Sequence, residues 1–253
     1  MLASDRRSQI LAYVREEGSA RVRELSRMFD VTEPTIRQSI DLLEAEGHIR
    51  REHGGAILKD VDDQVSRLAL QHSENMALKR RIAARALDLV TDGMSVILDS
   101  GSTTTELARL LKRHSDLRVV TNAVNIALLL GSSFSIDVLV TGGEFKPPTL
   151  SLSGDRAAEF FDGLTVDVLF LATGGVSPRY ELTYPSLSDL SVKSAMLRSA
   201  RRRVLLCDST KFGRSDFATL AEIDCVDLLV TDDGISAAQR DAVEKRGIRS
   251  EEH

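Results

Sequence analysis

The sequence predicts a small N-terminal α+β domain over residues 1–57 and a C-terminal α/β domain with a mostly parallel sheet over residues 76–253. Two observations predict this division. Helical apolar spacing in the first part ends in a short basic segment, whereas farther along the chain short apolar runs alternate with helical stretches. Residues 58–75 between them are polar and acidic, without a clear apolar period, and predict a linker. At 253 residues the chain is long enough for two domains.

Three helices are predicted in the N-terminal domain. Their buried faces are marked by apolar residues at helical spacing: Ile10, Leu11 and Val14 in the first, Val22, Leu25, Met28 and Phe29 in the second, and Ile36, Ile40 and Leu43 in the third. Gly18 is expected to cap the end of the first helix. Thr32 is expected at the N-cap of the third, with Pro34 in the first turn, where its missing N–H costs little.

The outward face of the third helix and the segment after it suit duplex DNA. Gln can pair with adenine and Arg with guanine in the major groove. Residues 47–56 predict a basic two-stranded wing. Each piece alone is more often an ordinary packed helix or a solvated side chain, but in this order they predict a winged helix-turn-helix. The residues expected to contact DNA are Thr32, Thr35, Arg37, Gln38, Arg50, Arg51 and His53.

The net charge bears on how DNA would be held. The chain carries −5, and residues 1–60 have ten Lys and Arg against eleven Asp and Glu, a balance of −1. Because DNA-binding domains usually carry a basic footprint, the basic residues here must gather on one face. Weak net attraction also favours two such domains on one operator. We therefore expect a homodimer or homotetramer, joined through the C-terminal domain, on a repeated or palindromic site.

Other classes of protein are disfavoured by composition. No apolar run approaches the roughly 20 residues that span a bilayer, and the N-terminus lacks the apolar region of a signal peptide. Cys207 and Cys225 stand outside any ligand-spaced cluster, so we expect no metal and no cofactor. These features favour a cytoplasmic protein.

Six apolar runs predict the strands of the C-terminal domain: 96–98, 119–120, 138–140, 168–171, 204–206 and 228–230. Small, hydroxyl, amide and glycine residues follow most of them. Open α/β sheets bind ligands outside the carboxyl ends of their strands, so a ligand site is expected there.

Residues 99–105, leading into a helix predicted over 106–111, have the composition of an anion cradle. The alternative is that these Ser and Thr residues only cap the helix. Neither a Walker loop nor a Gly-x-Gly-x-x-Gly fingerprint is present, which disfavours nucleotides. Lys211, just beyond a strand end, can pair with a phosphate or carboxylate. Tyr184 and Lys193 are expected on a loop and helix start that cover the pocket.

The complete set of expected effector contacts lies at or near the strand ends: Asp99, Ser100, Gly101, Ser102, Thr103, Thr104, Asn122, Gly142, Gly143, Gly174, Gly175, Tyr184, Lys193 and Lys211. The two glycine pairs could equally be plain tight turns.

Both halves resemble the DeoR family of bacterial regulators, also called DeoR/GlpR. The resemblance rests on Thr35-Ile36-Arg37, the wing at 51–56, and the stretches 98–104, 172–175 and 208–213. It implies a sensor half related in fold to ribose-5-phosphate isomerase and CoA transferases that binds phosphorylated sugars or polyols. The chain departs from the family's usual residues at Gln38-Ser39-Ile40, at Gly101-Ser102 and at Glu181-Leu182-Thr183.

Two functions follow from these observations. The first is a transcriptional regulator, most simply a repressor of sugar or polyol catabolism genes. The second is a sugar-phosphate isomerase or CoA-transferase-like enzyme using the C-terminal sheet. An isomerase needs a base beside the sugar carbons, yet Lys193 is followed by Ser194 rather than by an acidic residue. A wing and a recognition helix have no role in such an enzyme, which favours the regulator.

Overall fold

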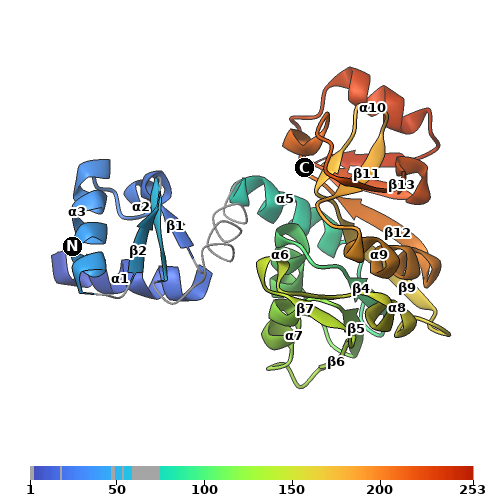
Figure 1. Ribbon diagram of the computed structural model, residues 1–253, viewed down its shortest axis with the longest axis horizontal. Coiled ribbons are helices and arrows are strands. Elements are labelled where there is room, and N and C mark those ends of the chain that lie inside the picture. Colours follow the sequence, from blue (N-terminus) through green and yellow to red (C-terminus); the bar gives the residue numbers. More distant parts are fainter. Residues whose placement is uncertain (1–2, 18, 47–48, 53, 59–74, 253) are drawn as a thin grey trace. The chain divides into compact units, whose positions relative to one another are not determined.

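The computed structural model describes residues 3–17, 19–46, 49–52, 54–58 and 75–252, which form two compact units divided between Glu74 and Asn75 (Figure 1). Gly18, His53 and residues 59–74 of the predicted linker lie outside the described residues. Leu58 is the last residue of a strand in the first unit.

The N-terminal unit consists of α1 (Ala3–Glu17), β1 (Ser19–Arg21), α2 (Val22–Met28), α3 (Glu33–Ala45), β2 (Ile49–Glu52) and β3 (Gly55–Leu58). The strands form an antiparallel sheet in the order β1-β3-β2. The three predicted helices and the two-stranded wing are confirmed. Strand β1 was not predicted, because three residues carry no periodic signal. It approaches β3 so closely that a Cβ at Gly55 would lie 2.3 Å from the carbonyl oxygen of Ala20.

The core of this unit contains nearly all of the predicted apolar faces, including Ile10, Leu25, Ile36 and Ile40. Met28 is an exception, since it is 50% exposed. Three residues advance a helix by about 300°, so each step of three moves the side chain about 60° away from the buried face. After two such steps from Val22, Met28 has left the core. Phe29, four residues after Leu25, remains packed against it.

A seven-stranded sheet is the centre of the C-terminal unit. In spatial order it contains β15 (Arg249–Glu252), β14 (Leu228–Thr231), β12 (Ala200–Leu206), β9 (Val166–Ala172), β4 (Ser95–Leu98), β5 (Leu117–Thr121) and β6 (Ile136–Val140). Every neighbouring pair is parallel. All six predicted runs lie in these strands, which confirms the predicted parallel sheet. The polar strand β15 was missed.

Helices cover both faces of this sheet. Because side chains alternate along a strand, Val96 and Leu98 of β4 enter one core while Ile97 enters the other. The first core includes residues of α5 (Met76–Leu87), α6 (Ser102–Leu111) and α7 (Val124–Leu130). The second includes residues of α8 (Asp155–Glu159), α9 (Ser188–Arg198) and α10 (Ala237–Glu244).

Two smaller sheets lie in the same unit. One is antiparallel and consists of β10 (Gly175–Val176), β11 (Glu181–Tyr184) and β13 (Ala218–Glu222). The other is a hairpin of β7 (Glu144–Lys146) and β8 (Ser151–Ser153), joined through the 3-10 helix η1 (Pro147–Thr149). Further 3-10 turns are η2 (Ser209–Lys211) and η3 (Ile223–Cys225). Tyr184 was expected on a loop and instead ends strand β11.

Among the described residues, none of the helices has the length and apolar character needed to cross a membrane. No group of three or more His, Cys, Asp and Glu side chains among these residues could hold a metal ion.

Burial raises the pKa of the Cys207 thiol to about 12, so this cysteine behaves as a neutral core side chain.

Candidate effector site and DNA-contacting surface

The strand order places a topological switch point between β4 and β9. From β4 the chain proceeds outward through β5 to β6, then returns to the other side of β4 as β9 and proceeds outward through β12, β14 and β15. Ligands of open α/β sheets bind outside the carboxyl ends of the strands at such a point. Asp99 directly follows β4 and Thr173 directly follows β9. The predicted motifs that begin at these two residues therefore flank the switch point.

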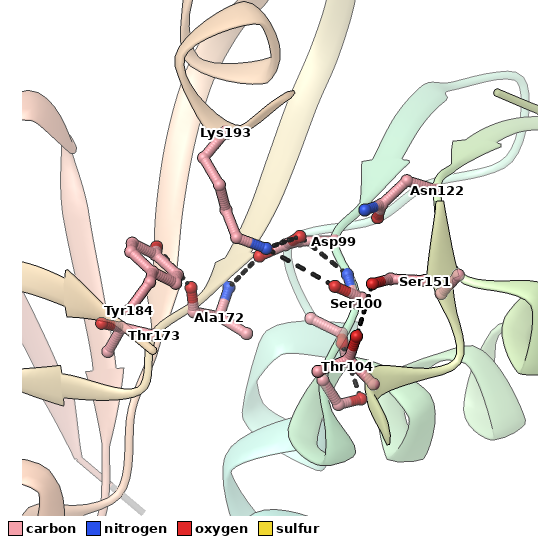
Figure 2. A network of polar contacts seen from close by, with 12 residues as sticks. Asp99, Ser100, Thr104, Asn122, Ser151, Ala172, Thr173, Tyr184 and Lys193 are labelled. Atoms are coloured by element: carbon pink, nitrogen blue, oxygen red, sulfur yellow. Dashed lines mark hydrogen bonds and ion pairs between the residues drawn. The ribbon is translucent and has the colours of Figure 1, made fainter. Parts of the chain in front are cut away.

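Asp99 joins β4 to β9 and to α9 through its buried carboxylate (Figure 2). Oδ1 accepts hydrogen bonds from the N–H of Ser100 at 2.7 Å and from Lys193 Nζ at 2.5 Å, and Oδ2 accepts one from the N–H of Ala172 at 3.0 Å. The ammonium of Lys193 also lies 3.5 Å from Ser100 Oγ and 5.1 Å from the centre of the Tyr184 ring. The Lys193 side chain is 5% exposed, so Asp99 and Lys193 form a buried ion pair.

The first turn of α6 offers backbone donors beside this pair. Helix α6 begins at Ser102, four residues before the predicted start at Glu106, with Gly101 as its N-cap. The N–H groups of a first turn have no acceptor within the helix, and the helix dipole there favours an anion. The hydroxyl of Thr104 was expected to serve the same anion. It donates instead to the carbonyl of Gly101 at 2.9 Å, as the Thr105 hydroxyl does at 2.7 Å.

Asn122 follows β5 and points its amide toward Ser100 (Figure 2). The side-chain Nδ2 of Asn122 donates to the backbone carbonyl of Leu152 at 3.1 Å, and the backbone carbonyl of Asn122 accepts a hydrogen bond from the N–H of Leu152 at 2.7 Å. Strand β8 is thereby attached to the end of β5. The Asn122 side chain is buried, yet Oδ1 has no hydrogen-bond partner among the described residues. The buried hydroxyl of Thr141, at the end of β6, is in the same condition. Such atoms call for a partner that a ligand can provide.

Lys211 lies at the opposite side of the switch point, in η2 after β12. Its Nζ donates to the carbonyl of Thr173 at 2.5 Å, which places a half-buried cation at the end of β9. Burial raises the pKa of the nearby Asp216 carboxyl, while the charges of Lys211 and Arg214 lower it. The cation is therefore held by a neutral carbonyl with a carboxylate close by.

Most of the glycines at the strand ends allow neighbouring protein segments to pack closely, and do not leave open space for a ligand. A Cβ at Gly101 would lie 2.7 Å from the Cβ of Ala172, and one at Gly174 would lie 1.9 Å from Asp216 Oδ2. Gly143 and Gly175 are also closely packed, against β8 and α8 and against Arg214. Gly142 alone of the four paired glycines has open space where a Cβ would be.

Two further side chains of the site differ from expectation. The Tyr184 hydroxyl donates to the carbonyl of Ala172 at 2.7 Å, and burial raises its pKa well above the usual range, with the charge of Asp99 adding to the effect. Asp189 was not predicted, although it lies one helical turn before Lys193 on α9. Burial raises the pKa of the Asp189 carboxyl. The positive charges of Lys193 and Lys146 lower this pKa, and the negative charge of Asp99 raises it further. The spacing of four residues from Lys193 was the available signal.

On the N-terminal unit, the exposed face of α3 carries Arg37 and Gln38. Arg37 pairs with Glu33 at 2.7 Å. Thr32 occupies the N-cap as predicted, but its hydroxyl bonds to that of Thr35 at 2.9 Å and does not cap the helix.

The wing is attached to the same helix. In β2, Arg51 Nη1 lies 2.6 Å from Asp41 Oδ1, and the N–H of Arg51 donates to Glu44 Oε1 at 2.8 Å. Arg50 is half-buried, and His53 lies outside the described residues. The structure thus places an outward helix face and a wing arginine together. Both Arg37 and Arg51 are paired with carboxylates of α3, which sequence spacing did not reveal.

Comparisons with known proteins agree over most of the chain. Residues 6–61 match the model of the DeoR-like helix-turn-helix domain, and residues 74–233 match that of the DeoR C terminal sensor domain. The HTH-type transcriptional regulator GlpR of Haloferax volcanii is 31% identical, over 98% of this chain and 97% of that protein. The lactose phosphotransferase system repressor of Lactococcus lactis is 31% identical, over 91% of each. A ribose-5-phosphate isomerase in complex with phospho-erythronic acid gives a TM-score of 0.41 at 21% identity, over 55% of this chain and 54% of that one.

Proposed function

The chain belongs to the DeoR family of transcriptional regulators, and we propose that a phosphorylated sugar or polyol controls its hold on operator DNA. The family assigns DNA binding to the N-terminal unit and sensing to the C-terminal unit. Since a relative is a repressor of a lactose phosphotransferase system, we assign this chain to the repression of sugar or polyol catabolism genes. It acts in the cytoplasm, where its operator is.

The switch point carries the proposal for the effector. A phosphate at the first turn of α6 would meet the free N–H groups there, with Lys211 within reach as a counter-charge. Asn122 Oδ1, which lacks a donor in the described part of the chain, would accept a hydrogen bond from a hydroxyl of the ligand.

A thermal-shift screen tests this proposal. Ligands that bind only the native state raise stability by RT ln(1 + [L]/Kd). We expect glycerol 3-phosphate or a hexose 6-phosphate to stabilise the protein, and the unphosphorylated parents not to. Equal stabilisation by parent and phosphate would rule out a phosphate site.

An isomerase function is not favoured by the site. A catalytic base must be free to take a proton from a sugar carbon. Asp99, the carboxylate at the switch point, already accepts three hydrogen bonds, from Ser100, Ala172 and Lys193. The site is better suited to binding a ligand than to removing a proton from it.

Effector control requires that the ligand prefer one arrangement of the protein over another. A ligand shifts operator affinity only by its differential affinity for the two arrangements. Typical coupling free energies are about 1–3 kcal/mol, which correspond to about 5- to 150-fold changes in affinity.

The DNA assignment predicts different effects for two arginines. Arg37→Ala is expected to weaken operator binding by about 1–3 kcal/mol and to relax base preference, because this side chain faces the major groove. Arg51→Ala is expected to weaken binding to all DNA sequences alike, because the Arg51 side chain is proposed to contact a phosphate. It should also lower the slope of log affinity against log salt concentration by about one. In the free protein Arg37 pairs with Glu33 and Arg51 with Asp41. Each arginine must therefore leave its carboxylate, or bind DNA while it keeps that pair. Gel-shift titrations over a salt series measure both effects.

Arg113→Ala, which removes an exposed arginine of the other unit, is the matched control and should change neither quantity. Parent-like binding by both Arg37→Ala and Arg51→Ala would refute the assignment.

We further propose that the chain forms a dimer or tetramer through the C-terminal unit. The two outer strands of its sheet differ: β15 carries Arg249 and two glutamates, whereas β6 is mainly Ile, Val and Leu. Charged residues protect a sheet edge from association, and apolar ones do not. Phe134, in the turn two residues before β6, is fully exposed, and Leu128 of α7 is 76% exposed.

Light scattering is expected to give at least twice the chain mass of 27.8 kDa. Phe134→Asp should lower the mass toward that of one chain, whereas Phe217→Asp, at an exposed phenylalanine after η2, should not. A parent that is monomeric at micromolar concentration, with and without operator, would contradict the assembly.

A further inference from the structure

Asn75 has an unusual backbone for its position. It is the N-cap of α5, with φ 56° and ψ 31°, in the left-handed region. Residues other than glycine adopt this region infrequently, and Asn does so more readily than most. Such a conformation persists where the surroundings hold it in place. The Asn75 side chain makes no capping hydrogen bond to α5, so it has another role.

That side chain reaches the loop that carries Lys211. Asn75 Nδ2 donates to Thr210 Oγ1 at 3.0 Å and approaches Asp208 Oδ1 at 3.5 Å. The buried Asp208 carboxylate in turn accepts hydrogen bonds from the N–H of Thr210 at 3.2 Å and from its hydroxyl at 2.5 Å. The neighbouring Lys211 donates to Thr173. Asn75 is thus connected through η2 to the cation proposed to meet the effector.

Asn75 lies where the C-terminal unit begins, directly after the segment that joins the two units. Residues 59–74 join the two units covalently, and Asn75 directly follows them. Helix α5 beyond it is fixed to the sheet, because Ile82, Ala83 and Ala86 lie in the core. Asn75 therefore stands between a fixed helix and the segment that leads to the DNA-binding unit.

We propose that Asn75 is a positioning residue that couples occupancy of the effector site to operator affinity. The inference rests on the proposed function. An anion bound to the Lys211 ammonium pulls on η2 through that side chain, and so displaces the acceptors that hold Asn75 in its left-handed conformation. Once released, Asn75 takes an ordinary backbone conformation and redirects the chain that precedes it. The coupling needs no contact of Asn75 with either ligand or DNA.

The Asn75→Gly variant distinguishes the role of the Asn75 side chain from that of its backbone conformation. Glycine adopts the left-handed conformation freely but lacks the amide. Thr210→Val removes the acceptor from the other side while keeping the shape. Asn125→Ala is the matched control, because Asn125 also donates Nδ2 to a threonine hydroxyl, that of Thr105 at 2.9 Å.

The probe is inorganic phosphate at constant ionic strength. Thermal shift reports its binding, and fluorescence anisotropy reports operator affinity with and without it. In the parent and in Asn125→Ala we expect phosphate to change operator affinity about fivefold or more. In Asn75→Gly and Thr210→Val we expect phosphate affinity within about twofold of the parent, with the change in operator affinity reduced at least about threefold.

Each other outcome is decisive. Parent-like coupling in Asn75→Gly overturns the inference. Loss of phosphate binding in that variant makes Asn75 part of the ligand site and overturns it as well, and so does phosphate binding without any change in the parent's operator affinity. If phosphate does not stabilise the parent, the proposed effector site itself fails, and that failure is visible before any variant is compared.

Discussion

Asp99→Ala is expected to lower the melting temperature of the C-terminal unit by roughly 6–20 °C. Removing one partner of a buried ion pair costs about 3–5 kcal/mol, because the other charge stays buried and uncompensated. For a unit of this size each kcal/mol corresponds to roughly 2–4 °C. In this variant Lys193 would keep Ser100 Oγ at 3.5 Å and the Tyr184 ring at 5.1 Å, and its charge would still interact with Asp189 on the same helix. Scanning calorimetry of the full chain measures the shift.

A second variant separates the effect of charge from that of lost hydrogen bonds. Asp99→Asn with Lys193→Met removes both charges and keeps an oxygen acceptor at position 99, so it is expected to recover much of the stability. Arg201→Met is the control, since its ion pair with Asp167 at 3.3 Å is exposed and such pairs contribute at most about 1 kcal/mol. A double variant no more stable than Asp99→Ala would show that the charge pair is not the cause.

The sheet could be predicted from the sequence because buried parallel strands contain nearly continuous apolar runs. Phe170 and its neighbours in β9 are such a run. The strand β15 could not be predicted in this way, because an edge strand with one exposed side has no need of apolar residues. Strand β11 was also missed. Its four residues pair only with the small strands β10 and β13, and Pro185 follows directly, as it would in a loop.

The location of the candidate site could likewise be predicted, since parallel strands bring their carboxyl ends together whatever their separation in sequence. Its internal bonding could not. Asp99 and Lys193 are 94 residues apart, and no spacing rule relates them. Thr104 was assigned to a ligand because a hydroxyl at a helix start suits an anion, whereas the helix itself uses that hydroxyl. Local patterns identify which groups are present but not which of them remain available.

Lys211→Ala is expected to make the protein unresponsive to its effector while operator binding without effector stays unchanged. The Lys211 ammonium lies at the end of β9, held by the carbonyl of Thr173, a neutral group that a phosphate readily displaces. A hydrogen bond between charged groups contributes about 1.5–3 kcal/mol, so the loss corresponds to roughly 10- to 150-fold weaker binding. The residues proposed to contact DNA belong to the other unit, which the substitution does not touch.

Calorimetry with a phosphorylated ligand and its unphosphorylated parent, on the parent protein and on variants, measures this loss. Lys211→Arg keeps the charge and should retain part of the affinity. Lys245→Ala is the matched control, because it removes an exposed lysine that pairs with Asp241 at 2.6 Å in α10 and should leave binding intact. If Lys211→Ala binds the phosphorylated ligand as tightly as the parent does, the phosphate does not meet Lys211. The anion would then be held by the first turn of α6 alone, and Lys211 would serve only to attach η2 to the end of β9.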